Sequence, residues 1–139
     1  MIVLDTNVIS EILRPQPEHR VAVWMESLTE DVSITAVTLA ELLAGVRRLP
    51  EGRRQSALSA MIDAALEPYR ETKAILSFDV RAAEQYAEIL VARERAGHPI
   101  HTADAQIAAI CRAHGATCAT RNLKDFEGTG VELVDPWAE

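Results

Sequence analysis

Four acidic side chains follow the apolar stretches of this sequence or lie in the first turns of the helical patterns after them. They are Asp5, Glu41, Asp104 and Asp125. In an open parallel sheet, ligands bind in the crevice beyond the carboxyl ends of the strands. If the apolar stretches pair as parallel strands, acids that are far apart in the sequence meet at one edge of the sheet.

Such a cluster of acids predicts a metal site. Two carboxylates about 4 Å apart repel each other by roughly 4 kcal/mol at an effective dielectric of about 20, so three or four of them need protons or a cation. Mg²⁺ prefers oxygen ligands, and one or two carboxylates commonly hold it together with several waters. A bound ion of this kind polarises a phosphoryl oxygen and lowers the pKa of its water. We therefore expect hydrolysis of a phosphodiester bond.

The elements that must bring the acids together alternate along the chain. Runs of apolar and β-branched residues predict strands at 2–4, 32–36, 74–78, 117–120 and 131–134. Apolar residues spaced by three and four predict helices at 8–13, about 18–28, 38–46, 53–67, 80–95 and 102–114. Residues 121–126 are expected to form a polar loop or a single helical turn.

This alternation is typical of βαβ units, which give a mostly parallel sheet covered on both faces. We predict one α/β/α sandwich domain over residues 1–139. In the helix over 38–46, Thr38 and Glu41 stand in the spacing of a capping box, and Pro68 is expected to end the helix over 53–67. These two helices predict an αα-hairpin with four arginines at its tip.

Composition excludes several classes of protein. Apolar residues make up 48% of the 139, which is typical of a folded core and excludes a disordered chain. The net charge of −7 argues against a basic polyanion binder, although arginine supplies twelve of the fourteen cationic side chains and a local patch can still bind nucleic acid. Cys111 and Cys118 are expected to be small buried hydrophobes.

No apolar run approaches the roughly 20 residues that a membrane-spanning helix needs, so we expect a cytoplasmic location and no membrane partner.

Each acid also has a simpler structural explanation. Asp5 could cap a helix, Glu41 could complete the box with Thr38, and Asp104 could stabilise the positive end of a helix dipole. Capping does not explain why the relevant strand ends all carry an acid.

At this point the chain resembles the PIN-domain ribonucleases, in particular the toxins of VapBC-type toxin–antitoxin pairs and the FitB-like proteins. The resemblance extends over the whole chain. It depends on ordered segments at 2–10, 38–45, 100–109, 119–126 and 131–137.

The resemblance implies an endoribonuclease that depends on Mg²⁺ or Mn²⁺. By position, Asp5 and Asp104 resemble the direct metal ligands of this family, and Glu41 a ligand that acts directly or through water. Thr6 and Thr120 resemble the hydroxyl donors that orient a carboxylate or a water.

The sequence leaves open whether Asn122 or Asp125 occupies the fourth position of the acidic site. Relatives have Asp where this chain has Asn122, and Asp125 in the same loop could compensate for that change. Arg121 and Lys124 lie beside this loop, and together with His101 they are the candidates for contact with substrate. Exposed salt-bridge partners are the simpler explanation of the two cations.

The resemblance also implies partners. They are an RNA substrate and a cognate antitoxin like VapB or FitA, whose C-terminal segment occupies the acidic groove. The resemblance implies a homodimer formed through helices 53–67 and 80–95. It also implies that the toxin can join a larger complex in which the antitoxin binds operator DNA.

Three other functions compete with this one. A phosphatase with Asp5 as its nucleophile needs a second acid where this chain has Asn7, and a phospho-acceptor receiver domain lacks its acidic pair. A PIN domain without catalytic activity that serves only as a binding scaffold is the third. Intact Asp5, Glu41 and Asp104 argue against that reading.

Overall fold

A parallel sheet of five strands, in the order β3-β2-β1-β4-β5, runs through the middle of the protein. The structure is a computed structural model that describes all residues from 1 to 139. The elements in chain order are β1 (Ile2–Leu4), α1 (Thr6–Ile12), α2 (His19–Ser27), β2 (Val32–Thr35), α3 (Ala36–Arg47), α4 (Arg53–Glu71), β3 (Ile75–Leu76), α5 (Val80–Arg95), α6 (Thr102–His114), β4 (Thr117–Ala119), α7 (Leu123–Phe126) and β5 (Leu133–Val134).

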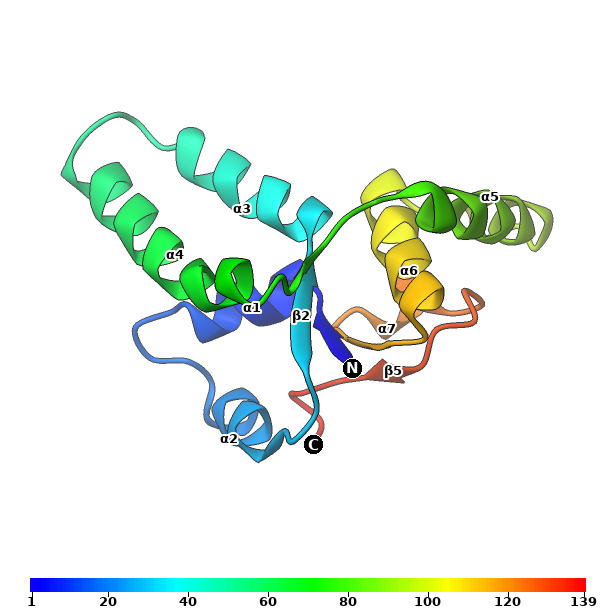
Figure 1. Ribbon diagram of the computed structural model, residues 1–139, viewed down its shortest axis with the longest axis horizontal. Coiled ribbons are helices and arrows are strands. Elements are labelled where there is room, and N and C mark those ends of the chain that lie inside the picture. The colour runs from blue at the N-terminus through cyan, green and yellow to red at the C-terminus, as the bar shows by residue number, and fades with distance from the viewer.

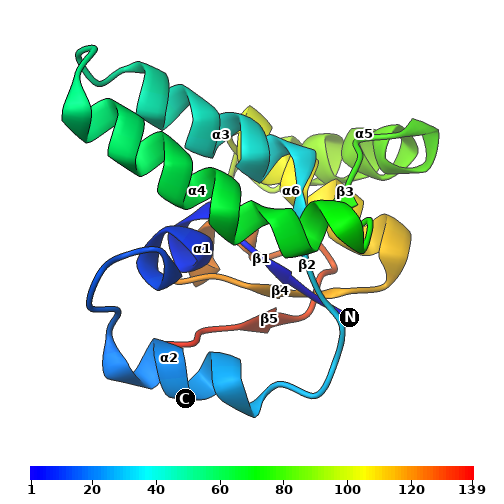
Figure 2. The same cartoon turned by 60° about the vertical axis from the view of Figure 1, so that its left-hand side comes forward.

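Helices cover the sheet on both sides. Figure 1 shows α3 and α4 beside each other on one side and α5 with α6 on the other. The view in Figure 2 places α2 and the C-terminus near β5. All four strand pairings are parallel, which confirms the predicted α/β sandwich and makes the sheet wholly rather than mostly parallel.

Two hydrophobic cores lie on the two faces of the sheet. Side chains alternate along a strand, so β1 contributes to both cores: Val3 belongs to the core with α5 and α6, and Ile2 and Leu4 belong to the core with α1, α3 and α4. All three residues of β1 are buried. Because β1 lies at the centre of the sheet, this burial fixes the position of the residue that follows it, Asp5.

The predicted αα-hairpin is formed by α3 and α4, and Arg47, Arg48, Arg53 and Arg54 lie at its tip. Both views place this tip at the end of the hairpin far from the sheet (Figures 1 and 2).

The two cysteines are free and buried, as expected. None of the helices combines the length and the apolar character that crossing a bilayer requires.

The predicted start of the third helix is wrong. The helix begins at Ala36 directly after β2, and Thr35 is its N-cap, with the Thr35 hydroxyl accepting from the amide of Thr38 at 3.1 Å. Thr38 and Glu41 therefore form no capping box, and the Glu41 carboxylate is free for another contact.

Several other boundaries differ from the prediction, among them the end of the fourth helix and the extent of the third and last strands. The fourth helix continues through Pro68 to Glu71, because the carbonyl of Ala64 that Pro68 leaves without a donor belongs to an exposed residue. The third strand is shorter than predicted, since β3 is an edge strand that pairs with β2 alone.

Candidate active site

The acids meet at the carboxyl edge of the sheet. Asp5 directly follows β1, and Thr120 directly follows the neighbouring strand β4. On the other side of β1, strand β2 leads straight into α3, which carries Glu41. Because the three strands are parallel neighbours, their ends bring these side chains together, as the strand-end rule predicts.

Asp5 is held by donors on both of its carboxylate oxygens. Oδ1 accepts from the backbone amide of Thr6 at 2.8 Å, and Oδ2 accepts from the Thr120 hydroxyl at 2.8 Å and the Asn7 amide at 3.2 Å. The residue is 5% exposed. Burial raises the pKa of Asp5 despite the hydrogen bonds from Thr120 and Thr6, and the negative charges of Glu41 and Asp125 raise it further. Asp5 thus both caps α1 and faces the cluster of acids.

A chain of hydroxyl groups orients Glu41. The Thr6 hydroxyl donates to Glu41 Oε1 at 2.6 Å and lies 3.0 Å from the hydroxyl of Thr38. Because a hydroxyl has one proton, Thr6 must accept from Thr38 if it donates to Glu41. Thr38 in turn accepts from Thr35 at 3.4 Å, so the chain of donors runs from β2 to the carboxylate.

Asp104 lies in the first turn of α6, and its surroundings disfavour its charge. Burial and then the charges of Asp5 and Asp125 raise the pKa of Asp104 to about 6, a smaller contribution from Glu41 acts the same way, and His101 opposes the rise. The charges of Asp5, just after β1, and of Glu41 in α3 and Asp125 in α7 thus all act on Asp104. This mutual repulsion is the condition that a cation relieves.

The donor set fits a hydrated divalent ion. Every candidate ligand is a carboxylate oxygen, which suits Mg²⁺ or Mn²⁺. No three Asp, Glu, His or Cys side chains are arranged as a ready set of metal ligands. A site of one or two carboxylates completed by waters is the usual arrangement for Mg²⁺, and the structure is compatible with it.

The loop after β4 separates the two candidates for the fourth acid. Asp125, in the first turn of α7, contributes its charge to Asp5 and Asp104. Asn122 is exposed, and its backbone amide donates to the Thr120 hydroxyl at 3.0 Å. Asp125 is therefore the candidate whose charge reaches the other acids.

The three candidates for substrate contact lie in different places. His101 is the exposed N-cap residue of α6, close enough for its charge to act on Asp104. Arg121 adjoins Asp5 through Asn7, because its backbone amide donates to Asn7 Oδ1 at 3.2 Å. Lys124 instead lines another pocket, of about 350 Å³, beside His98 and Arg93.

Asn7 and Arg93 are two residues whose positions at the site sequence reasoning missed. The Asn7 side chain joins Asp5 to the loop after β4, so the amide occupies the place where a phosphatase would need its second acid. Arg93 is buried at 8% exposure, and its guanidinium donates to the backbone carbonyls of His98, Asp125 and Glu127. The sequence singled out Asn7 only as the position of a missing second acid, and it gave no signal for Arg93.

Comparison with known proteins gives consistent matches. The family described as PIN domain matches residues 2–131. The chain is 42% identical over 138 residues to "Toxin FitB" of Neisseria gonorrhoeae and 36% identical over 138 residues to "VapC ribonuclease Y4jK" of Sinorhizobium fredii, covering 98% or more of each chain. A chain in the solved structure of FitAB bound to a DNA fragment superposes with a TM-score of 0.90 at 41% identity, over 99% of this chain and 96% of that one.

Proposed function

We propose that this chain, which belongs to the PIN domain family, is an endoribonuclease dependent on a divalent metal and the toxin of a toxin–antitoxin pair. The names of its relatives support both parts of the proposal. One is called a toxin and another a VapC ribonuclease, and each matches the chain over nearly its full length.

The meeting of Asp5, Glu41, Asp104 and Asp125 at one sheet edge is the observation that carries the proposal. Burial and then the charges of Asp5 and Asp125 raise the pKa of Asp104 to about 6, so the folded protein holds this carboxylate at an electrostatic cost. Perturbed carboxyl groups gathered in this way are characteristic of functional sites. We therefore propose that the cluster exists to bind a cation.

Asp5 and Asp104 are the carboxylates that would hold a divalent ion directly, with Glu41 and Asp125 acting directly or through water. When bound, the ion supplies a Lewis acid for the phosphoryl oxygen and lowers the pKa of the attacking water. Thr120 and Asn7 keep the Asp5 carboxylate in one orientation. Thr6 occupies only Oε1 of Glu41, so Oε2 stays free to accept a proton from that water.

The reaction is then a simple hydrolysis. The water oxygen forms a bond to phosphorus, the bond between phosphorus and the leaving ribose oxygen breaks, and that oxygen takes up a proton. No covalent bond to the protein is required. This differs from the phosphatase alternative, in which Asp5 would attack the phosphorus itself.

We propose that the antitoxin binds in a largely apolar pocket beside the acids. This pocket, of about 430 Å³, shares Thr6 and Glu41 with the site and continues between α1, α3 and α4 over Leu42, Val46, Leu49, Leu58, Met61 and Ile62. A helix with an apolar face fits such a groove, and a cationic side chain at its end would reach Glu41. Self-association into a homodimer stays a prediction.

Cleavage by the purified protein tests the proposal. We expect RNA to be cut with Mg²⁺ or Mn²⁺ and left intact with a chelator, and we expect Asp5→Asn and Asp104→Asn to abolish cutting. Asp63→Asn, on the exposed side of α4, is the matched control. Cutting without metal, or full activity in both site variants, would contradict the proposal. Antitoxin binding without any cleavage would instead favour the inactive scaffold.

A further inference from the structure

A polar pocket of about 560 Å³ opens beside the acid cluster. It is lined by Glu11, Arg14, Gln16, Glu18, Arg20, Arg121 and Trp137, which come from the end of α1, the start of α2, the loop after β4 and the C-terminal segment. Arg121 connects it to the site, since Asn7 binds both the Arg121 amide and Asp5. A polymer that binds at the acids could therefore extend into this pocket.

Two arginines of this pocket are positioned by one tryptophan. Arg20 Nη1 donates to the carbonyl oxygen of Trp137 at 3.2 Å. The guanidinium of Arg121 lies over the Trp137 ring, 4.9 Å from its centre. Neither arginine belongs to any of the ion pairs of the protein. Both charges are thus fixed in place and not neutralised.

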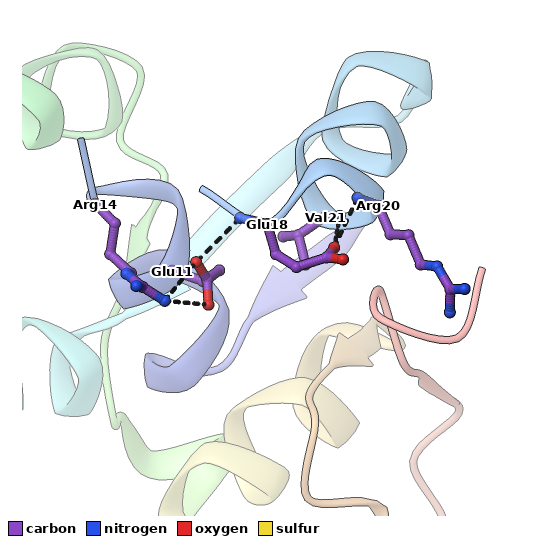
Figure 3. Close-up of polar contacts among 5 residues, drawn as sticks. All are labelled: Glu11, Arg14, Glu18, Arg20 and Val21. Carbon is purple, nitrogen blue, oxygen red and sulfur yellow. Dashed lines mark hydrogen bonds and ion pairs between the residues drawn. The ribbon is translucent and has the colours of Figure 1, made fainter. Parts of the chain in front are cut away.

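The two acids of the pocket are already bound to other groups. Glu11, which is 7% exposed, accepts from Arg14 and from the backbone amide of Glu18 at 3.1 Å. Glu18 caps α2 by accepting from the amides of Arg20 and Val21. Figure 3 shows the Glu11 carboxylate between Arg14 and the Glu18 amide, while the Arg20 side chain extends away from both acids toward the C-terminal segment. These acids hold α1 and α2 together and leave Arg20 and Arg121 available.

We propose that Arg20 and Arg121, held by Trp137, form a subsite for a backbone phosphate of the RNA next to the one that is cut. This inference rests on the proposed ribonuclease function and adds a position for the substrate. An arginine stacked on a ring presents its N–H edge outward, and that edge matches the oxygens of a phosphate. In a protein with a net charge of −7, this local pair also offsets the repulsion between RNA and the acids.

Binding of a fluorescent single-stranded RNA, measured by anisotropy with Ca²⁺ to prevent cutting, tests the subsite. We expect Arg20→Gln and Arg121→Gln each to weaken binding about tenfold. Each should also lower the slope of log affinity against log salt by about 0.7, the value for one lost contact with a single strand. Arg53→Gln, an exposed arginine at the hairpin tip, removes the same charge far from the pocket and should bind as the unmodified protein does.

The inference is overturned if the three variants bind RNA alike, or if the unmodified protein binds no RNA. It is also overturned if Arg20→Gln weakens binding of the antitoxin and leaves RNA binding unchanged, because the pocket then belongs to the protein partner. A cleavage assay separates the two proposals. Cleavage with an unchanged KM in Arg20→Gln removes only the subsite, and RNA binding as expected with no cleavage under any metal removes only the nuclease.

Discussion

Asp104 is a carboxyl group whose surroundings favour its protonated form. Burial raises its pKa to about 6, helped by the charges of Asp5 and Asp125. The folded protein therefore holds this proton more tightly than the unfolded chain, whose carboxyl group titrates near the ordinary value of 3.8. A metal that binds Asp104 must displace the proton, so metal affinity and pH are coupled.

The pH dependence of metal binding follows from this shift. Below about pH 6 we expect the affinity for Mn²⁺ to fall by about tenfold per pH unit, since one proton is displaced, and above it to level off. In the absence of metal, the stability of the fold should change with pH in the opposite direction. Because the folded state keeps the Asp104 proton that the unfolded chain loses, the free energy of unfolding should decrease as the pH rises from about 4 to about 6. Calorimetric titration of Mn²⁺ and urea unfolding at a series of pH values measure the two effects. A metal affinity that does not change between pH 5 and 7 would contradict this reading of Asp104.

Thr6 is the residue that connects Glu41 to the chain of hydroxyls. Thr6→Val keeps the shape of the side chain but removes the donor to Glu41, so we expect kcat to fall by about 10- to 100-fold, as for other groups that orient metal ligands. Thr6→Ser keeps the hydroxyl and is the control, expected near the unmodified activity. Equal activity of the Val and Ser variants would show that the contact has no role.

Sequence reasoning located the acids, and the family resemblance named Thr6 and Thr120 as hydroxyl donors, but the remaining groups that orient the acids were not predicted. Asp5 and Asp104 could be found because the strand-end rule needs only the order of strands and helices. The Thr35–Thr38–Thr6 chain depends on how the end of β2, the first turn of α3 and the start of α1 pack together, which the spacing of residues in the sequence does not report. For the same reason, the choice between Asn122 and Asp125 needed coordinates.

At the scale of the elements, Arg93 ties three parts of the chain together. It projects from the last turns of α5, and its guanidinium donates to carbonyls before α6 and around α7. The first segment leads into α6, which carries Asp104, and the second carries Asp125. The buried guanidinium thus links the segments that lead to two of the four acids.

Removal of this guanidinium should destabilise the protein. Arg93→Met keeps most of the volume and leaves three carbonyl oxygens without their donor, so we expect a loss of about 2–4 kcal/mol in the free energy of unfolding. Arg112→Met is the control, because Arg112 also binds this loop, at the Thr129 carbonyl, but is more exposed and should cost about 1 kcal/mol. Urea unfolding compares the two. A loss for Arg93→Met no larger than that of Arg112→Met would refute the account.

The elements show which boundaries a sequence can fix. Helix types and most bounds follow from apolar spacing, as in α5, which spans 80–95 as predicted. The start of α3 was missed because Ala36 and Val37 fit both a strand and a helix, and tertiary packing decides between them. The strand order was not predicted either, since alternation implies parallel strands without saying which are neighbours.

At the scale of the whole molecule, the acid cluster lies between two pockets of different character. The pocket over α3 and α4 is largely apolar, and the pocket at Arg20 and Trp137 is polar and carries arginines. We assign the first to the antitoxin and the second to RNA. The two partners would then meet at the acids and at Arg14, which lines both pockets, so their binding competes.

Substitution in the apolar pocket tests this division. Met61→Asp places a charge in the groove, so we expect weaker binding of the cognate antitoxin and unchanged RNA cleavage. Val23→Asp, at a similarly exposed apolar residue on α2, is the control and should bind antitoxin normally. Surface plasmon resonance with the purified antitoxin measures both variants. Unchanged binding by Met61→Asp would place the partner elsewhere.

Binding of Mn²⁺, followed by electron paramagnetic resonance, is the most direct measurement of the central claim that the four acids form one cation site. The unmodified protein should bind Mn²⁺, and Asp5→Asn and Asp104→Asn should each weaken binding by at least about tenfold while the circular dichroism spectrum stays the same. Asp63→Asn should bind as the unmodified protein does. Mn²⁺ binding of equal strength in all four proteins would contradict the claim.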